Sequence, residues 1–355
     1  MVNRSERIFY FDALRALAIL LVILLHVNGH IAELVHYTIH NIYTLQGIHQ
    51  TFVTNFLRIG VDLFLMLSGA LLLGRSESVK EFYIKRIPRL VKPFLFWALV
   101  FTVMLFAVSY FLPGLGIVGQ FGPLGFLQLF ADMLLCRAPG SVVYWFVWMM
   151  LAVYILMPFL NKWIINADLS KIEYFLIVWV VYNILVYTLM LPIPPAISFV
   201  VSPVGFAVLG YYLRYTPRRL FTNPIIIWSL IIIPSIMMLI YAYTLVHVDL
   251  LFIFERYSLP VTLVAMGVFC LFKNTESINH VATPVRKAIS SVALCSYGMY
   301  LIHGQMMMVA RKIFHLSSNY IFDFLVLFAV GFIFSWLIIY VLSKIPIVND
   351  LIGVK

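Results

Sequence analysis

Long apolar runs recur along the whole chain, and they limit its possible folds more than any other feature. The run FDALRALAILLVILLHVNG at residues 11–29 is long enough to cross a bilayer as one helix. Only 11% of the 355 residues are charged, whereas about a quarter are charged in a typical soluble domain. The sequence therefore predicts an all-α polytopic membrane protein with a single transmembrane domain over residues 1–355. We place about ten transmembrane helices at residues 9–28, 56–74, 90–112, 142–162, 173–191, 197–214, 225–246, 256–273, 292–312 and 321–343.

The distribution of lysine and arginine predicts how these helices thread the bilayer. If the N-terminus lies inside, most of the 24 Lys and Arg residues fall in cytoplasmic segments, as the positive-inside rule requires. We therefore expect an even number of spans with both termini in the cytoplasm. The net charge of +10 is then a topology signal, and we expect the lipid bilayer rather than a nucleic acid as a partner.

Three shorter features complete the outline of the chain. The first apolar run follows Arg4 and Arg7, as in a signal peptide, but it lacks a small-x-small cleavage site, so we expect a retained helix. Residues 124–136 are too few to span, and they predict a short interfacial or re-entrant helix. The histidines at 30, 36, 40 and 49 fall in an outer loop without the spacing of a zinc site, so we expect no metal centre.

Charged residues inside the first apolar run are the strongest functional signal. Eleven helical steps separate Arg15 from His26, which is three turns plus roughly 20°, so both side chains point to one face. The two residues lie about 16 Å apart along the helix axis, and Asp12 is placed to pair with Arg15. Polar groups in a span usually face a bundle interior or a wet cavity. The alternative is that Arg15 snorkels to the inner surface and that His26 sits at the outer interface.

The spacing R-x10-H in a first span resembles the signature of the membrane acyltransferase-3 family, bacterial inner-membrane proteins that move acyl groups onto sugars. Four further blocks strengthen the resemblance, and they follow in order along nearly the whole chain: GVDLFLMLSGALL at 60–72, FYIKRIPRLVKPF at 82–94, VYWFVWMMLAVYILMPFL at 143–160 and SYGMYLIHG at 296–304. Some members carry an appended soluble domain, and we expect none here.

The resemblance implies an O-acetyltransferase of the bacterial inner membrane, with acyl-CoA, most simply acetyl-CoA, as the donor and a carbohydrate hydroxyl as the acceptor. No permanently bound cofactor is expected. The candidate catalytic residues are His26 as the general base, together with Arg15, Asp62 and His303. The threading places His26, Asp62 and His303 in the outer part of their spans. A covalent acyl-histidine is an alternative route.

Binding residues follow from the same blocks and from the threading. Arginine suits phosphate because its planar fork donates two parallel hydrogen bonds. The expected acyl-CoA-binding residues are Arg15, Tyr297, Tyr300 and, in the basic loop after the second span, Arg86 and Arg89. The expected acceptor-binding residues at the outer side are Trp145, Glu255 and Arg256. For Arg86 and Arg89 the alternative is a pure topology signal, and for the two tyrosines it is packing.

Two other classes of function remain open at this point. A transporter or flippase for a lipid-linked sugar would also need charged residues along its path. A non-catalytic membrane partner or sensor leaves the shared face of Arg15 and His26 unexplained. The sequence leaves the acceptor sugar, the acyl chain and the oligomeric state open.

Overall fold

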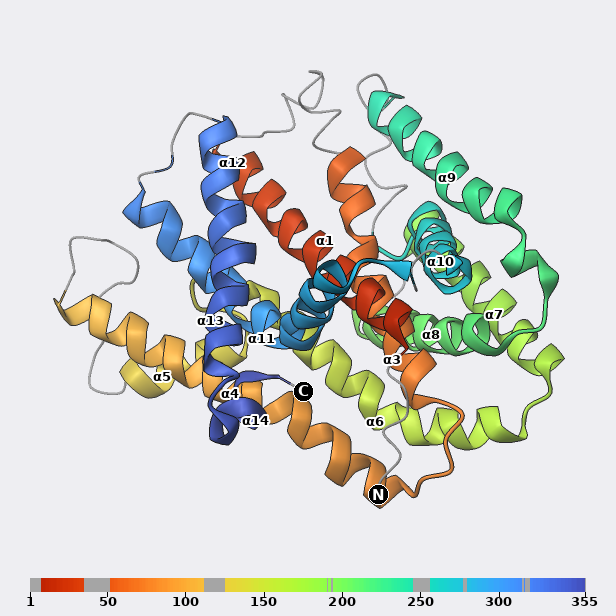
Figure 1. Cartoon of the computed structure of the whole chain (residues 1–355), viewed down its shortest axis with the longest axis horizontal. Helices are drawn as coiled ribbons and strands as arrows, with labels where there is room; N and C mark the ends of the chain where they lie inside the picture. The colour runs from red at the N-terminus through yellow and green to blue at the C-terminus, as the bar shows by residue number, and fades with distance from the viewer. Residues whose placement is uncertain are drawn as a thin grey trace. The chain divides into compact units, whose positions relative to one another are not determined.

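The computed structural model describes residues 8–34, 52–111, 125–189, 191, 192, 194–244, 256–276, 280–314, 316 and 320–354. Every regular element in these ranges is a helix, so the all-α prediction is confirmed (Figure 1). The elements that matter here, in chain order, are α1 (Phe9–Leu34), α3 (Ile59–Leu72), α4 (Val79–Phe111), α5 (Gly125–Leu134), η3 (Ser141–Tyr144), α6 (Trp145–Asn166), α7 (Leu169–Asn183), η4 (Ile184–Thr188), α8 (Pro195–Tyr215), η5 (Arg219–Thr222), α9 (Pro224–Thr244), α10 (Leu259–Asn274), α11 (Thr283–Ile313), α12 (Tyr320–Phe328), η7 (Ala329–Phe334), α13 (Ser335–Leu342), η8 (Pro346–Val348) and α14 (Asn349–Ile352).

The described helices have the length and composition of a multi-pass membrane protein. Eight of them are long and apolar enough to cross a bilayer, and each coincides with a predicted span. The other two predicted spans, 256–273 and 292–312, fall on α10, with 16 residues, and on α11, with 31 residues. The short helix expected at 124–136 is present as α5, with 10 residues. The side on which the termini lie stays a prediction.

The chain divides into two compact units, which we describe separately. The first unit holds Met1–Leu25, Tyr37–Glu77 and Ile155–Ala293, and the second holds His26–His36, Ser78–Tyr154 and Leu294–Lys355. Helices α1, α6 and α11 each contribute residues to both units.

Close packing of α3 on α8 forms the centre of the first unit. A Cβ atom on Gly69 would lie 1.7 Å from the carbonyl oxygen of Ala207, and one on Gly210 would lie 1.9 Å from that of Met66. No side chain fits at either position, so the two backbones touch directly. Glycine is therefore required here for helix packing rather than for a turn.

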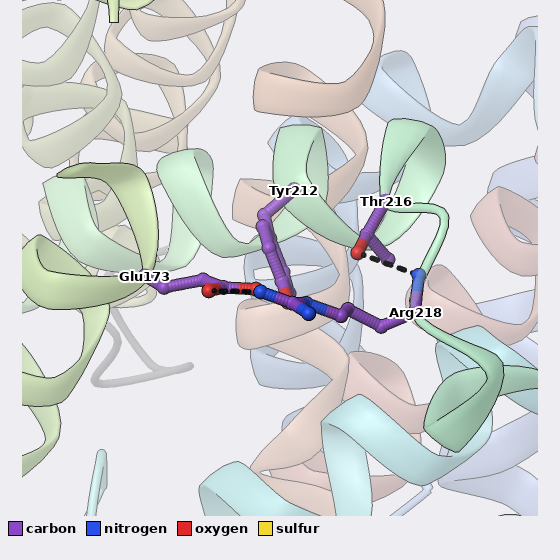
Figure 2. A network of polar contacts seen from close by, with 4 residues as sticks. All are labelled: Glu173, Tyr212, Thr216 and Arg218. Atoms are coloured by element: carbon purple, nitrogen blue, oxygen red, sulfur yellow. Dashed lines mark hydrogen bonds and ion pairs between the residues drawn. The ribbon is translucent and has the colours of Figure 1, made fainter. Parts of the chain in front are cut away.

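A polar clamp joins α7 to the segment after α8 in the same unit, as Figure 2 shows. The Glu173 carboxylate accepts from Arg218 Nε at 2.8 Å and from Arg218 Nη2 at 2.9 Å, and it also accepts from the Tyr212 hydroxyl at 2.8 Å. The Arg218 backbone N–H donates to the Thr216 hydroxyl oxygen at 3.2 Å. The hydrogen bonds that Arg218 donates to Glu173 raise the pKa of the Arg218 guanidinium above its ordinary value. This clamp holds the exposed segment after α8 against α7.

In the second unit α4 packs on α5 and on α14, and α12, η7 and α13 form one continuous rod (Figure 1). The prediction that Arg86 and Arg89 lie in a loop is wrong, because α4 already begins at Val79 rather than at the predicted residue 90. A capping box explains this start: the Glu81 carboxylate accepts from the Ser78 N–H at 3.1 Å, and the Glu81 N–H donates to the Ser78 hydroxyl at 3.2 Å. Arg86 and Arg89 therefore lie on a helix.

Candidate functional site

A pair of hydrogen-bonded histidines lies in the second unit. Nε2 of His303, on α11, is 3.0 Å from Nδ1 of His26, near the end of α1, and their ring centroids are 4.9 Å apart. His303 is completely buried and His26 is half-buried. The structure therefore brings together two of the predicted catalytic residues, which are 277 positions apart in the sequence.

The backbone around His303 fixes where the protons of this pair must sit. Nδ1 of His303 lies 2.7 Å from the carbonyl oxygen of Tyr300. A carbonyl can only accept, so His303 Nδ1 donates, and its Nε2 carries the lone pair in the neutral ring. His26 Nδ1 must then donate to His303 Nε2. The remaining lone pair of the neutral His26 ring is on Nε2, which makes that nitrogen the basic atom of the pair.

Packing around η3 holds the His303 turn of α11 in place. The Tyr300 hydroxyl donates to the Val143 carbonyl, and its ring lies 5.0 Å from the ring of Phe146. Gly140 has a φ of +74°, a left-handed conformation that favours glycine. A Cβ atom there would lie 3.1 Å from the Gln305 Cα atom, so η3 approaches the α11 backbone closely. These contacts pack η3 and the turn before it against α11 on both sides of His303.

A second hydrogen-bonded pair, which was not predicted from the sequence, lies on the same two helices. Nη1 of Arg311 donates to Nδ1 of His30 at 2.9 Å. The prediction that His30 is a solvated loop residue is wrong, because α1 continues to Leu34 and His30 is half-buried on it. His26 and His30 lie one helical turn apart in the sequence, and this spacing indicates that both side chains point to the same face of one helix. The other loop histidines, 36, 40 and 49, lie outside the described residues.

Arg15 lies in the part of α1 that belongs to the first unit. Because α1 is one continuous helix, the predicted spacing of about 16 Å along its axis between Arg15 and His26 holds. Asp12 is buried, and its carboxylate accepts from the Ser290 hydroxyl at 3.0 Å. The pairing of Asp12 with Arg15 stays a prediction.

Asp62 belongs to the first unit and is completely buried. Neither of its carboxylate oxygens has a hydrogen-bond partner among the described residues. Arg256 and Arg58, both in the first unit, act on this carboxyl group electrostatically. Tyr257, next to Arg256, is buried with a φ of 71°, which is unusual for a residue with a side chain. Glu255 lies outside the described residues.

The remaining candidates lie on α4, α6 and α11. Arg86 is half-buried on α4, whereas Arg89 is exposed. The Tyr297 hydroxyl donates to the Leu90 carbonyl at 2.6 Å, which joins α11 to α4 and favours the packing interpretation of this residue. Trp145 is the first residue of α6 and is half-buried, with its ring 6.1 Å from that of Phe146. Among the described residues no group of three His, Cys, Asp or Glu side chains has the arrangement of a metal site.

Comparison with known proteins adds one finding. A family model described as an acyltransferase domain matches residues 8–340 of the 355. The match covers both histidine-bearing helices, α1 and α11, and every predicted span except residues 341–343 at the end of the tenth. No curated protein and no solved structure matches the chain.

Proposed function

Because the chain belongs to the acyltransferase-3 family, it is a membrane acyltransferase, and we propose that it moves an acetyl group from cytosolic acetyl-CoA to a carbohydrate hydroxyl. The proposed location is the bacterial inner membrane, and the proposed acceptor is a cell-surface or lipid-linked sugar. The observation that carries the proposal is the His26–His303 pair, with its tautomers set by the carbonyl of Tyr300. The histidine pair alone would also suit a transporter, because pumps and transporters use histidines in proton relays; the match to an acyltransferase family is what argues against a flippase.

In the proposed mechanism His26 acts as the general base. Its Nε2 takes the proton of the acceptor hydroxyl while the hydroxyl oxygen attacks the thioester carbonyl. The new C–O bond forms, the C–S bond breaks, and the coenzyme A thiolate leaves with the proton that His26 held. Such a positioned base typically contributes about 10²–10⁴-fold to the rate. A route through an acyl-histidine would use the same nitrogen as the nucleophile.

His303 has the role of a positioning residue in this mechanism. Its Nε2 accepts from His26 Nδ1 at 3.0 Å and thereby orients the ring of the base. When His26 becomes an imidazolium, this hydrogen bond joins a charged donor to a neutral acceptor and becomes stronger. The complete burial of His303 keeps water from competing for the bond.

The donor requires cationic groups for its phosphates. In the second unit we propose the half-buried Arg86 as such a group, because guanidinium forks match phosphate oxygens. For Arg15, in the first unit, a role in donor binding stays a prediction. A role in acceptor binding stays a prediction for Arg256, in the first unit, and for Trp145 at the start of α6, and a catalytic role stays one for Asp62.

The test is acetyl transfer by the purified full chain in nanodiscs, with radiolabelled acetyl-CoA and a panel of lipid-linked sugars. We expect transfer by the wild type, and loss of transfer with retained acetyl-CoA binding for His26→Ala. His280→Ala is the matched control, because His280 is exposed and lies outside the pair. Near-normal turnover by His26→Ala would refute the general-base mechanism, and no acetyl-CoA consumption with any acceptor would refute the proposed donor.

A further inference from the structure

Along one side of α4 the exposed side chains change from basic to apolar partway along the helix. Lys85, Arg89 and Lys92 are all exposed, and steps of 100° per residue place them within an arc of about 60°. We call these three residues the basic stripe. Leu95 and Leu99 follow on the same side and are also exposed. The step from Lys92 to Leu95 is about 4.5 Å along the axis, so the change from basic to apolar is abrupt.

The lengths of the two parts match the layers of a bilayer. The exposed apolar side continues through Val103 and Tyr110 to Phe111 at the end of α4. From Leu95 to Phe111 the helix rises about 24 Å, slightly less than the roughly 30 Å of a hydrocarbon core. The basic stripe covers about 10 Å, which is of the order of one headgroup layer.

The backbone of α4 gives an independent indication of the same boundary. Pro88 and Pro93 lie inside the helix, and neither has an N–H to donate. The carbonyls of Ile84 and Arg89 therefore lose their helical partners. Carbonyls without a partner are costly in hydrocarbon but not at a wet surface. Both fall within the basic part of the helix, which places this part at the level of the headgroups.

The charge of the stripe is only partly balanced by its own helix. Glu81 lies one turn before Lys85 and interacts with it electrostatically. However, the same carboxylate already accepts from the N–H and hydroxyl of Ser78 in the capping box. The stripe therefore presents a net positive surface at the edge of an apolar one.

We propose that Lys85, Arg89 and Lys92 form a binding surface for the anionic phospholipid headgroups of one leaflet. Lysine offers a point charge to a phosphate and arginine a fork. This inference assigns the exposed Arg89 to lipid and leaves the half-buried Arg86 for the acyl donor. It stands independently of the acyl-transfer proposal, because lipid binding is measured without substrate.

The test is native mass spectrometry of the purified full chain in detergent with equal amounts of phosphatidylglycerol and phosphatidylcholine. We expect the wild type to retain phosphatidylglycerol preferentially, and Lys85→Gln/Lys92→Gln to lower that preference about 5- to 25-fold, since each basic side chain contributes roughly fivefold. The matched control is Lys162→Gln/Lys171→Gln, two exposed lysines of the first unit. An equal loss in the control would overturn the proposal, and so would displacement of the lipid by added acetyl-CoA.

A depth measurement keeps the proposal testable if the double variant folds poorly. In a Cys136→Ser background, a nitroxide label at Lys92→Cys should collide with an aqueous nickel chelate, and one at Leu99→Cys with dissolved oxygen. Contact of both labels with oxygen only would place the stripe inside the hydrocarbon and would refute the headgroup assignment.

Discussion

At the scale of single residues, the proposed mechanism depends on which ring nitrogen of His303 accepts the hydrogen bond from His26. Gln places an amide oxygen near the position of Nε2, whereas Asn places its amide near Nδ1, so the two variants separate the two hydrogen bonds of His303. We expect His303→Asn to lower kcat about 10²-fold, because His26 loses its acceptor, while KM for acetyl-CoA stays unchanged. His303→Gln should recover part of this loss. Measurements of kcat, KM and melting temperature check the prediction, and equal losses of activity and stability in both variants would indicate a packing role alone.

At the scale of elements, we expect the direct backbone contact between α3 and α8 to stabilise the first unit. Gly69→Ala would place a methyl group 1.7 Å from the Ala207 carbonyl oxygen, and the helices must separate to admit it. We expect a loss of about 1–3 kcal/mol in the free energy of unfolding. Gly29→Ala on α1 is the control, because nothing lies within 4 Å of its Cβ position, and we expect it to stabilise by up to about 1 kcal/mol. Denaturant titration of both variants in mixed micelles is the measurement, and an undiminished Gly69→Ala protein would refute direct contact.

At the scale of the whole molecule, the threading of the chain follows from its charge. The concentration of Lys and Arg in alternate connections predicts both termini in the cytoplasm. A reporter that works only in the cytoplasm should be active when it is fused after Lys355. A reporter that works only outside the membrane should be active when it is inserted between residues 35 and 51. Reporters that show the same side would contradict the even number of spans and the outer position of His26.

The sequence by itself determined the class of the protein and most of its helices. Apolar runs of about 20 residues require helices in a bilayer, because only an intrahelical pattern satisfies the backbone there. For this reason all ten predicted segments fall on helices. The errors are local ones with local causes: the capping box at Ser78 and Glu81 starts α4 early, and α1 continues past His30.

Only the tertiary structure decided which polar residues meet. The R-x10-H spacing fixes the side of α1 on which His26 lies, but it contains no information about a partner 277 positions away. The same holds for His30 and Arg311, which are 281 positions apart. In the second unit Gly140 permits the chain to approach α11 closely at Gln305, two residues after His303. Helix formation depends on neighbours in the chain, whereas the arrangement of the site depends on side-chain shapes that meet only after the helices have assembled.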